Sequence, residues 1–256
     1  MPNAAGPRYA LLRDISGRDE LALSGAEPMA ASELVERLLI DRPGAILRPG
    51  AQLSLSDRDR LVAALHTHCF GDQVECLVTC EKCSASFELT FQLSLMLRGL
   101  RASPPPDVEG PDESGHYCLP DGTRFRLPTT EDERAIGGLH PEQAVRTLLE
   151  RCVESGDPVA ASGAVQDAMD ALAPLLSLPV PVDCPECSAP QEVEFDMVRF
   201  FLSAFARERP ILLREIHAIA ASYHWRHNEI LELPRNERRA FVSLIVPVQE
   251  TRRTAA

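Results

Sequence analysis

The chain has 256 residues, of which 45% are hydrophobic, so it is long enough to bury the core of one elaborate domain or of two small ones. It carries 26 basic and 38 acidic residues, which gives a formal charge of −12. A general nucleic-acid surface or anionic-membrane surface needs clustered Lys and Arg, so this balance argues against both kinds of partner and favours proteins.

The predicted location is the cytoplasm. Residues 1–20 contain no apolar core of the signal-peptide type, and the richest apolar run, 171–182, is broken by three prolines and is too short to span a bilayer. Four of the eight cysteines form two Cys-x-x-Cys pairs and the other four are scattered. That distribution suits a reducing compartment and a metal site better than a secreted disulfide framework.

The amino-terminal part predicts two helices. The expected elements are disorder at 1–8, a short strand at 9–15, a polar turn at Ser16-Gly17, a helix at 31–40 that stops at Pro43-Gly44, an irregular stretch at 46–54, and a helix that opens at Ser56. Leu34, Val35 and Leu38 lie on one face of the first helix. Ser56 offers the second helix a cap acceptor with Asp59 three residues on, and Gly71 is suited to its end.

Two later stretches look like copies of one another. Residues 78–91 read VTCEKCSASFELTF, and residues 182–195, which lie 104 positions further on, read VDCPECSAPQEVEF. In each, alternating apolar residues lead into a Cys-x-x-Cys turn and out again, the pattern of two strands joined by a knuckle. Such a shared frame is hard to obtain by chance.

Together the two pairs offer a metal four thiolates, the tetrahedral set that a structural Zn²⁺ prefers, with no position left for water or substrate. We therefore predict one structural zinc per chain, with the ligands Cys80, Cys83, Cys184 and Cys187. His66 and His68 precede the first pair but are not expected to be ligands, because four cysteines complete the site.

Two alternatives stay open: unliganded thiol pairs in a core, and a redox dithiol, although redox pairs normally lie at a helix N-terminus. The separation is also unusual, since 100 residues lie between Cys83 and Cys184, against roughly 15–20 in ordinary zinc ribbons. Loss of the metal is therefore expected to free the intervening region.

That intervening region, 101–177, predicts an insertion with one hairpin and several helices. An apolar turn at 93–100 precedes it, and a proline-rich linker at 102–115 begins it. The predicted elements are then strands at 116–119 and 124–127 around an Asp-Gly turn, and helices at 128–138, 141–153 and 163–176. The acids at 131–133 are interpreted as caps that complement a helix dipole.

The carboxy-terminal part predicts helices only. Asp196 caps one helix, Pro210 is expected to begin a separate module, and two further helices follow near 225–231 and after Pro234. Three short helices can suggest a helix-turn-helix, but seven Arg against five Glu over 210–256 is too weak a basic charge for a bare DNA-reading domain.

Several motifs resemble a known family. The quoted residues are Gly71-Asp72 before the first cysteine pair, Arg126-Leu127-Pro128-Thr129, Leu148-Leu149-Glu150-Arg151-Cys152, Leu213-Arg214-Glu215-Ile216-His217, Tyr223-His224-Trp225, Glu229-Ile230-Leu231, Leu233-Pro234 and Arg238-Arg239. They resemble the zinc-ribbon baseplate and tail-assembly proteins, including hub assembly chaperones, of contractile phage tails and phage-like injection systems. The chain departs from the pattern at Arg226, where many members have a small cap residue, which leaves Asn228 as the nearby acceptor.

The resemblance implies a non-enzymatic structural or assembly protein that binds subunits of a phage-like baseplate, with no small-molecule substrate. It implies partner contacts by Tyr223, His224, Trp225, Ile230, Leu231, Arg238 and Arg239, although the aromatic residues are equally compatible with local core packing. Whether such a protein stays in a virion-like particle or leaves after assembly is open. The alternative function is a zinc-ribbon nucleic-acid-binding or regulatory protein, and we find no phosphate loop or hydrolase motif for an enzyme.

The predicted fold is α+β: a split zinc ribbon made of two Cys-x-x-Cys knuckle hairpins, with a large inserted hairpin-plus-helices region and a carboxy-terminal three-helix module. The expected parts are an arm with one helix at 1–50, the split zinc-ribbon domain at 51–200 with the insertion 101–177, and the helical module at 201–256.

Overall fold

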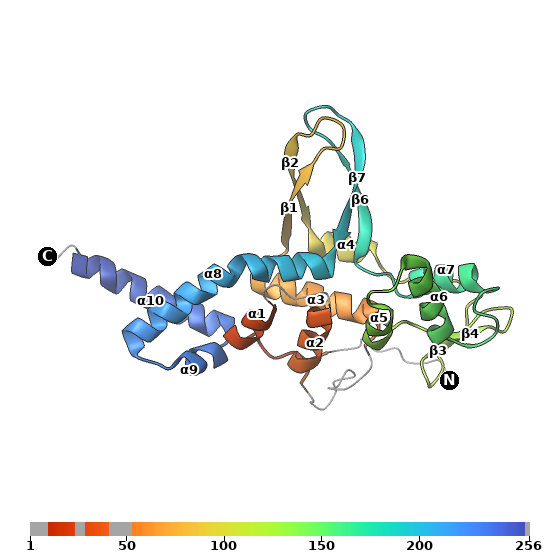
Figure 1. Cartoon of the computed structure of the whole chain (residues 1–256), viewed down its shortest axis with the longest axis horizontal. Helices are drawn as coiled ribbons and strands as arrows, with labels where there is room; N and C mark the ends of the chain where they lie inside the picture. Colours follow the sequence, from red (N-terminus) through yellow and green to blue (C-terminus); the bar gives the residue numbers. More distant parts are fainter. Residues whose placement is uncertain (1–9, 24–28, 41–52, 254–256) are drawn as a thin grey trace. The chain divides into compact units, whose positions relative to one another are not determined.

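The computed structural model describes residues 10–23, 29–40 and 53–253, with side chains as far as Ile245 (Figure 1). The chain forms two compact units, 52–198 and the combination of 1–51 with 199–256. The prediction treated 1–50 and 201–256 as two separate parts, whereas the described residues of both form one unit. No helix among the described residues is long and apolar enough to cross a membrane.

The unit at 52–198 mixes helices with three small antiparallel sheets, in the strand orders β1-β2, β3-β4-β5 and β6-β7. Its elements are α3 (Leu55–Phe70), β1 (Gln73–Thr79), β2 (Ser86–Gln92), α4 (Leu93–Gly99), β3 (His116–Cys118), β4 (Arg124–Arg126), α5 (Thr130–Ile136), α6 (Pro141–Cys152), β5 (Val153–Ser155), α7 (Ser162–Leu172), β6 (Ser177–Asp183) and β7 (Pro190–Asp196). The next helix, α8 (Met197–Tyr223), begins in this unit and continues into the other.

Two details at the ends of these elements correct the predictions. The N-cap of α3 is Ser54, whose hydroxyl accepts a hydrogen bond from the Asp57 N–H, while the Ser56 hydroxyl donates to the carbonyl of Pro174 instead. The apolar stretch expected to be a turn is helix α4. Gly71 does end α3, with a φ of 92° that favours glycine.

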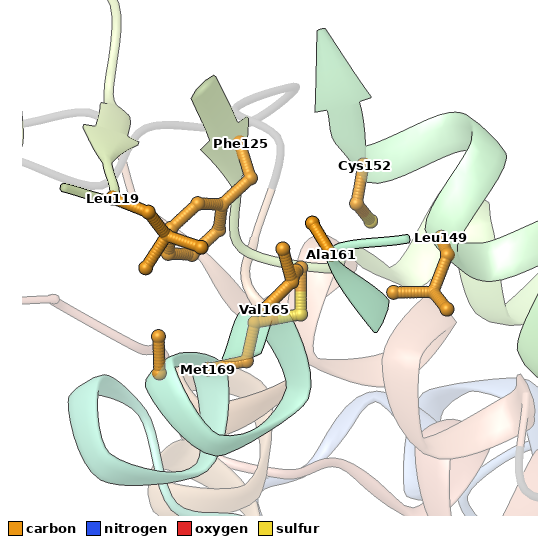
Figure 2. Close-up of a cluster of buried hydrophobic side chains, with 8 residues drawn as sticks. Leu119, Phe125, Leu149, Cys152, Ala161, Val165 and Met169 are labelled. Atoms are coloured by element: carbon orange, nitrogen blue, oxygen red, sulfur yellow. The ribbon is translucent and has the colours of Figure 1, made fainter. Parts of the chain in front are cut away.

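The inserted region has its own hydrophobic core (Figure 2). Phe125 of β4 is fully buried between Leu119 and the α7 residue Val165, and the Tyr117 ring stacks on it with 5.7 Å between centroids. Cys152, at the end of α6, packs in the same cluster, where burial raises the pKa of its thiol to about 11. This cysteine is therefore a core residue rather than a reactive thiol.

Polar contacts fasten the inserted region to α3. The buried Arg58 guanidinium bonds to Asp59 at 2.7 Å and to Glu133 of α5 at 2.8 Å. Asp59 in turn accepts the backbone N–H of Leu176 at 2.9 Å, just before β6. These contacts hold the middle of the insertion and its carboxy-terminal end to α3 independently of the cysteines, so metal loss alone is not expected to free the whole of 101–177.

Asp132 of α5 joins three segments of the insertion. It is completely buried and accepts five hydrogen bonds, two from the Arg126 guanidinium, one from Arg151, and two from the N–H and hydroxyl of Thr129. Burial alone would raise the pKa of Asp132, but these donors outweigh it and hold the pKa well below its usual range. The residue interpreted as a simple helix cap is therefore the centre of a buried ionic network.

Replacing Asp132 by Asn is expected to destabilise the unit by about 3 kcal/mol, because it leaves two guanidinium groups without their carboxylate. Urea unfolding followed by circular dichroism at neutral pH measures this, and Asp170→Asn, at an exposed site on α7, is the matched control. A carboxyl with a lowered folded-state pKa stabilises the fold above its unfolded pKa of about 4 and loses that contribution as the pH falls. The difference from wild type should therefore shrink at acid pH, and equal effects of the two variants would contradict the network.

The other unit is helical in its described part. It contains α1 (Gly17–Leu23), α2 (Met29–Leu38), most of α8, α9 (His227–Glu232) and α10 (Arg235–Arg253). The predicted strand at 9–15 is reduced to a bridge between Leu12 and Leu39, and the predicted turn at Ser16-Gly17 is the start of α1. Pro43-Gly44 and most of 46–54 lie outside the described residues.

Pro210 does not begin a separate module, because α8 runs through it without a break. Proline removes one helical hydrogen bond, but apolar residues on both sides of it, Phe205 before and Leu212 after, are buried. At the start of α9, the N–H of Arg226 donates to the Glu229 carboxylate at 2.8 Å. Glu229 therefore supplies the helix start that was expected to depend on Asn228.

The amino-terminal segment packs closely on the last helices. The N–H of Gly17 donates to the carbonyl of Leu233 and the N–H of Arg235 donates to that of Ile15. A Cβ at Gly17 would lie 3.0 Å from Nη1 of Arg238, so glycine permits this approach. The hydrophobic cluster of the unit comprises Leu212, Ile216, Ile219, Ile230, Leu231 and Ile245, with Leu21 of α1 packed against it.

Buried ion pairs reinforce this packing. Three arginines and three glutamates from α1, α8 and α10 form one network: Glu20, Glu208, Glu215, Arg235, Arg238 and Arg239. Arg238 is completely buried at its centre and donates to Glu20 and, at 2.7 Å, to Glu215. The network thus joins an element near residue 20 to elements more than 180 residues later in the chain.

Candidate metal centre

Two hairpins from distant parts of the chain form the site, as the paired cysteine motifs predicted. The strands β1 and β2 pair from Gln73↔Gln92 to Thr79↔Ser86, and β6 and β7 pair from Ser177↔Asp196 to Asp183↔Pro190. Each residue pair of the first hairpin has its counterpart 104 positions later in the second hairpin. The two hairpins lie side by side (Figure 1), and the rings of the equivalent residues Phe91 and Phe195 meet edge to face at 5.2 Å.

The correspondence extends beyond the shared sequence frame. A helix precedes each hairpin, α3 before the first and α7 before the second, and a helix follows each, α4 and α8. The first residue of each following helix, Leu93 or Met197, is fully buried and donates its N–H at 2.9 Å to the carbonyl that precedes the hairpin, that of Asp72 or Leu176. The unit is therefore a structural duplication of helix, hairpin and helix.

The two Cys-x-x-Cys turns, which we call knuckles (80–83 and 184–187), have the same backbone. In the first, the Cys80 N–H donates to Ala85 at 2.8 Å and the Ser84 N–H donates to Cys80 at 2.9 Å, and the equivalent bonds of the second are 3.0 and 2.8 Å. Ser84 and Ser188 both take up left-handed conformations, with φ of 60° and 52°. This shared conformation reverses the chain and turns both thiols of each pair in one direction.

The sulfur atoms of Cys80, Cys83, Cys184 and Cys187 all lie within 4.8 Å of one another, and no other such group of His, Cys, Asp or Glu occurs among the described residues. The pairs that cross between hairpins, Cys80 with Cys187 and Cys83 with Cys184, are both 3.7 Å apart. A disulfide would bring the sulfurs to about 2.0 Å. In a tetrahedron with metal–sulfur bonds of about 2.3 Å, neighbouring sulfurs lie about 3.8 Å apart, so these two distances fit a metal ion bound by four thiolates.

The surroundings of the sulfur atoms favour the ionised form of one cysteine, Cys80. Cys80 and Cys184 are buried, Cys187 is partly buried and Cys83 is exposed. The backbone N–H groups of Cys83 and Lys82 act on Cys80 and lower its pKa to about 6. For Cys83 the N–H of Ala85 acts in the same direction, but local desolvation and the three neighbouring sulfur atoms outweigh it and raise the pKa of Cys83 to about 12. Without a cation, Cys80 and Cys83 are therefore not both ionised at neutral pH.

The arrangement can hold a metal ion but offers it no open coordination position. Four sulfurs complete a tetrahedral set, which is typical of structural rather than catalytic sites. The knuckles lie between strands and not at the start of helices, in agreement with the argument against a redox pair. His66 is buried in α3 and packs on Phe70 at 5.2 Å between ring centroids, and it is not part of the cysteine group.

Comparison of the chain with protein-family models, with curated proteins and with solved structures found no match.

The residues predicted to contact partners divide into two sets. Tyr223 is exposed and Trp225 and Arg239 are partly exposed, and the rings of Tyr223, Trp225 and Phe241 form a cluster with centroids 5.0–5.7 Å apart. His224 is exposed next to them with a φ of 58°. By contrast, Ile230, Leu231 and Arg238 are buried inside their own unit. Because these three side chains are buried, they cannot contact a partner directly. The prediction of direct contact therefore applies only to Tyr223, His224, Trp225 and Arg239.

Sequence reasoning missed two residues that join the hairpins. The Oε1 atom of Gln191 accepts the N–H of Glu81 at 3.2 Å and so links the second hairpin to the first knuckle. Phe195 contacts Phe91 at the opposite end of the strands. The sequence repeat indicates the importance of the phenylalanines, because Phe91 and Phe195 occupy equivalent positions in the two copies. It gives no such indication for Gln191, because the equivalent residue in the first copy is Phe87.

Proposed function

We propose that the chain is a non-enzymatic structural or assembly protein of a phage-like contractile tail baseplate, and that a structural Zn²⁺ makes its paired hairpins a split zinc ribbon. The observation that carries the structural role is the meeting of four sulfurs, at tetrahedral spacing, from hairpins 100 residues apart in the chain. Zinc is the ion of choice because it is borderline-soft, binds thiolates strongly and has no geometric preference beyond the tetrahedron offered here.

The metal has a clear physical task. A two-stranded hairpin is at best marginally stable by itself, and the two hairpins belong to separate sheets that share no ladder hydrogen bonds. A closed metal site supplies the missing connection at their tips, while Phe91 and Phe195 supply it near their bases. Such a site organises a binding surface and leaves no position for substrate.

The baseplate role rests on the resemblance of the quoted motifs. Their residues Arg126, Thr129 and Arg151 converge on Asp132, and Leu231 and Arg238 lie in the interior of the other unit. Residues in such positions stabilise the fold, so their presence supports a fold similar to that of the baseplate proteins. The proposed contact surface for other baseplate subunits is the exposed aromatic cluster at Tyr223, His224 and Trp225 with Arg239.

Co-purification with the sheath, tube and spike proteins of a contractile tail tests this function. The variant Tyr223→Ser with His224→Ala should reduce recovery of a bound subunit by at least about fivefold, since exposed aromatic residues often dominate interface energies. Leu244→Ser, at a 62% exposed leucine of α10, is the matched control and should not reduce it. Point variants are preferable to truncation at residue 209, because that cut would divide α8. Absence of any tail-protein partner would defeat the proposal.

The alternative, a zinc-ribbon nucleic-acid-binding or regulatory protein, receives no electrostatic support. The hairpins at 73–92 and 177–196 carry eight carboxylates and a single lysine, whereas nucleic-acid surfaces need clustered basic residues. Titration with single-stranded and duplex DNA at low salt distinguishes the two functions, and tight salt-sensitive binding would favour the alternative.

A further inference from the structure

We propose that the paired hairpins form a second docking surface, for a basic protein segment that anchors an apolar side chain between them. The surface is a groove of about 620 Å³ lined by residues of β2, α4 and β6. Its apolar lining includes Phe91, Leu95, Met96, Leu178 and Val180. It differs from the aromatic surface of the proposed baseplate function and does not depend on it.

The groove is open to solvent, and its apolar lining is not fully covered by the described residues. Leu95 is 54% exposed although it is a leucine in a short helix packed beside a sheet. Phe91, Met96, Leu178 and Val180 are partly exposed along the same groove. Concave apolar surfaces of this size are typical of binding sites rather than of ordinary exposed surface.

The charge around the groove selects the class of partner. Thr90, Pro179 and Pro181 line it, and their cross-strand neighbours are Glu75, Glu194 and Glu192. Directly opposed residues of an antiparallel pair share one face, with Cβ atoms about 5 Å apart. These carboxylates therefore lie beside the groove.

No described basic side chain neutralises this rim. Glu192 and Glu194 are exposed and form no ion pair with the described residues, and Glu75 accepts a hydrogen bond only from the neutral Gln73. A divalent ion held by four thiolates would add two further negative charges at the hairpin tips. The complementary occupant is a segment with Lys or Arg on either side of its apolar anchor, while nucleic acid and anionic lipid are repelled.

The prolines of β6 define how the occupant binds. Pro179 and Pro181 occupy alternate positions of a strand that remains paired with β7, so these are the positions whose N–H groups would point away from β7. Because proline has no N–H group, the edge of β6 that faces away from β7 lacks these donors and cannot pair with an added strand. Recognition by side chains, as for an amphipathic helix laid in a groove, is the remaining mode.

The test uses the full-length, zinc-loaded chain and a fluorescent amphipathic helical peptide of leucine and lysine, with binding followed by anisotropy. Leu95→Glu should weaken binding at least about tenfold, because it places a charge in the apolar groove. Leu77→Glu is the matched control, since Leu77 is an 80% exposed leucine of β1 that does not line the groove. The Glu192→Lys and Glu194→Lys double variant should also weaken binding at least about tenfold, whereas Asp167→Lys with Asp170→Lys on α7 should not.

Two peptide controls complete the design. A peptide with glutamate in place of lysine, and one with serine in place of leucine, should both fail to bind. Equal binding of the acidic peptide, equal effects of the groove and control variants, or no binding of the basic peptide would each overturn the proposal. Baseplate subunits enter none of these measurements, so the groove and the baseplate function can fail separately.

Discussion

Removing the metal is expected to make the first knuckle cleavable at Lys82. The variant Cys184→Ser should fall from about one zinc equivalent per chain to less than half. Its cleavage by a lysine-specific protease should rise at least about tenfold over that of the zinc-loaded wild type, because local opening then exposes the knuckle. Metal analysis and the rate of appearance of the fragments 1–82 and 83–256 measure the two effects.

The assay is sharp because Lys82 is the sole lysine of the chain and lies between the predicted ligands Cys80 and Cys83. A protease needs an extended segment, and a knuckle whose two thiolates hold one ion cannot extend. Structural zinc binds small modules with roughly 10–16 kcal/mol at neutral pH, as much as the stability of a whole domain. Zinc should also leave as the pH falls, since protons compete for the thiolates.

Cys118→Ser is the control, because Cys118 lies in the same unit outside the cysteine cluster. It should retain zinc and protection of Lys82. Full zinc content in Cys184→Ser, or unchanged protection after chelation, would defeat the shared site. The inserted region should stay resistant to trypsin in every variant, because Arg58 and Asp59 hold it to α3 without the metal.

The second large effect is expected at Arg238. Arg238→Met should destabilise the unit that contains the amino-terminal segment by about 3 kcal/mol, because the buried Glu20 and Glu215 each lose a charged partner. Arg239→Met removes the same charge one residue later, but Arg239 is 41% exposed, so the cost should stay below about 1 kcal/mol. Urea unfolding of both variants gives the comparison.

Limited trypsin digestion provides an independent readout. Arg13 and Arg18 lie in the segment that the network holds, so cleavage there should increase in Arg238→Met and not in Arg239→Met. Equal stability losses in the two variants would show that burial of the charge does not govern the effect. Unchanged stability of Arg238→Met would show that the network contributes little beyond apolar packing.

The cysteine site could be predicted because its signals are local and repeated. Alternating apolar residues on either side of each cysteine pair predicted the two hairpins, and the Cys-x-x-Cys spacing predicted which four thiols come together. The sequence also predicted that the two hairpins meet, because one pair of thiols supplies only two of the four ligands of a tetrahedral metal site. The zinc itself remains a prediction, because the geometry restricts the class of ion without naming it.

The remainder depended on tertiary contacts that leave no periodic signal. The seven-residue helix α1 is too short to be stable alone and is held by contacts of Gly17 with the residues near Leu233. Pro210 predicts a boundary, yet packing on either side carries α8 through it. Charged residues such as Asp132 and Arg238 look like solvated surface in a sequence, and only the fold shows that they are buried with their partners.

The duplicated arrangement around the metal has a consequence for ancestry and divergence. One helix–hairpin–helix copy offers half a coordination shell, so two separate identical chains could have completed the same centre as a symmetric dimer. Joining both copies in a single polypeptide removes the dependence on concentration. It also lets the two copies differ: the second has Pro179 and Pro181 where the first has Glu75 and Leu77. A dimer of identical chains would have the same residues in both hairpins. Only the single chain with two copies can therefore carry different residues on its two hairpins.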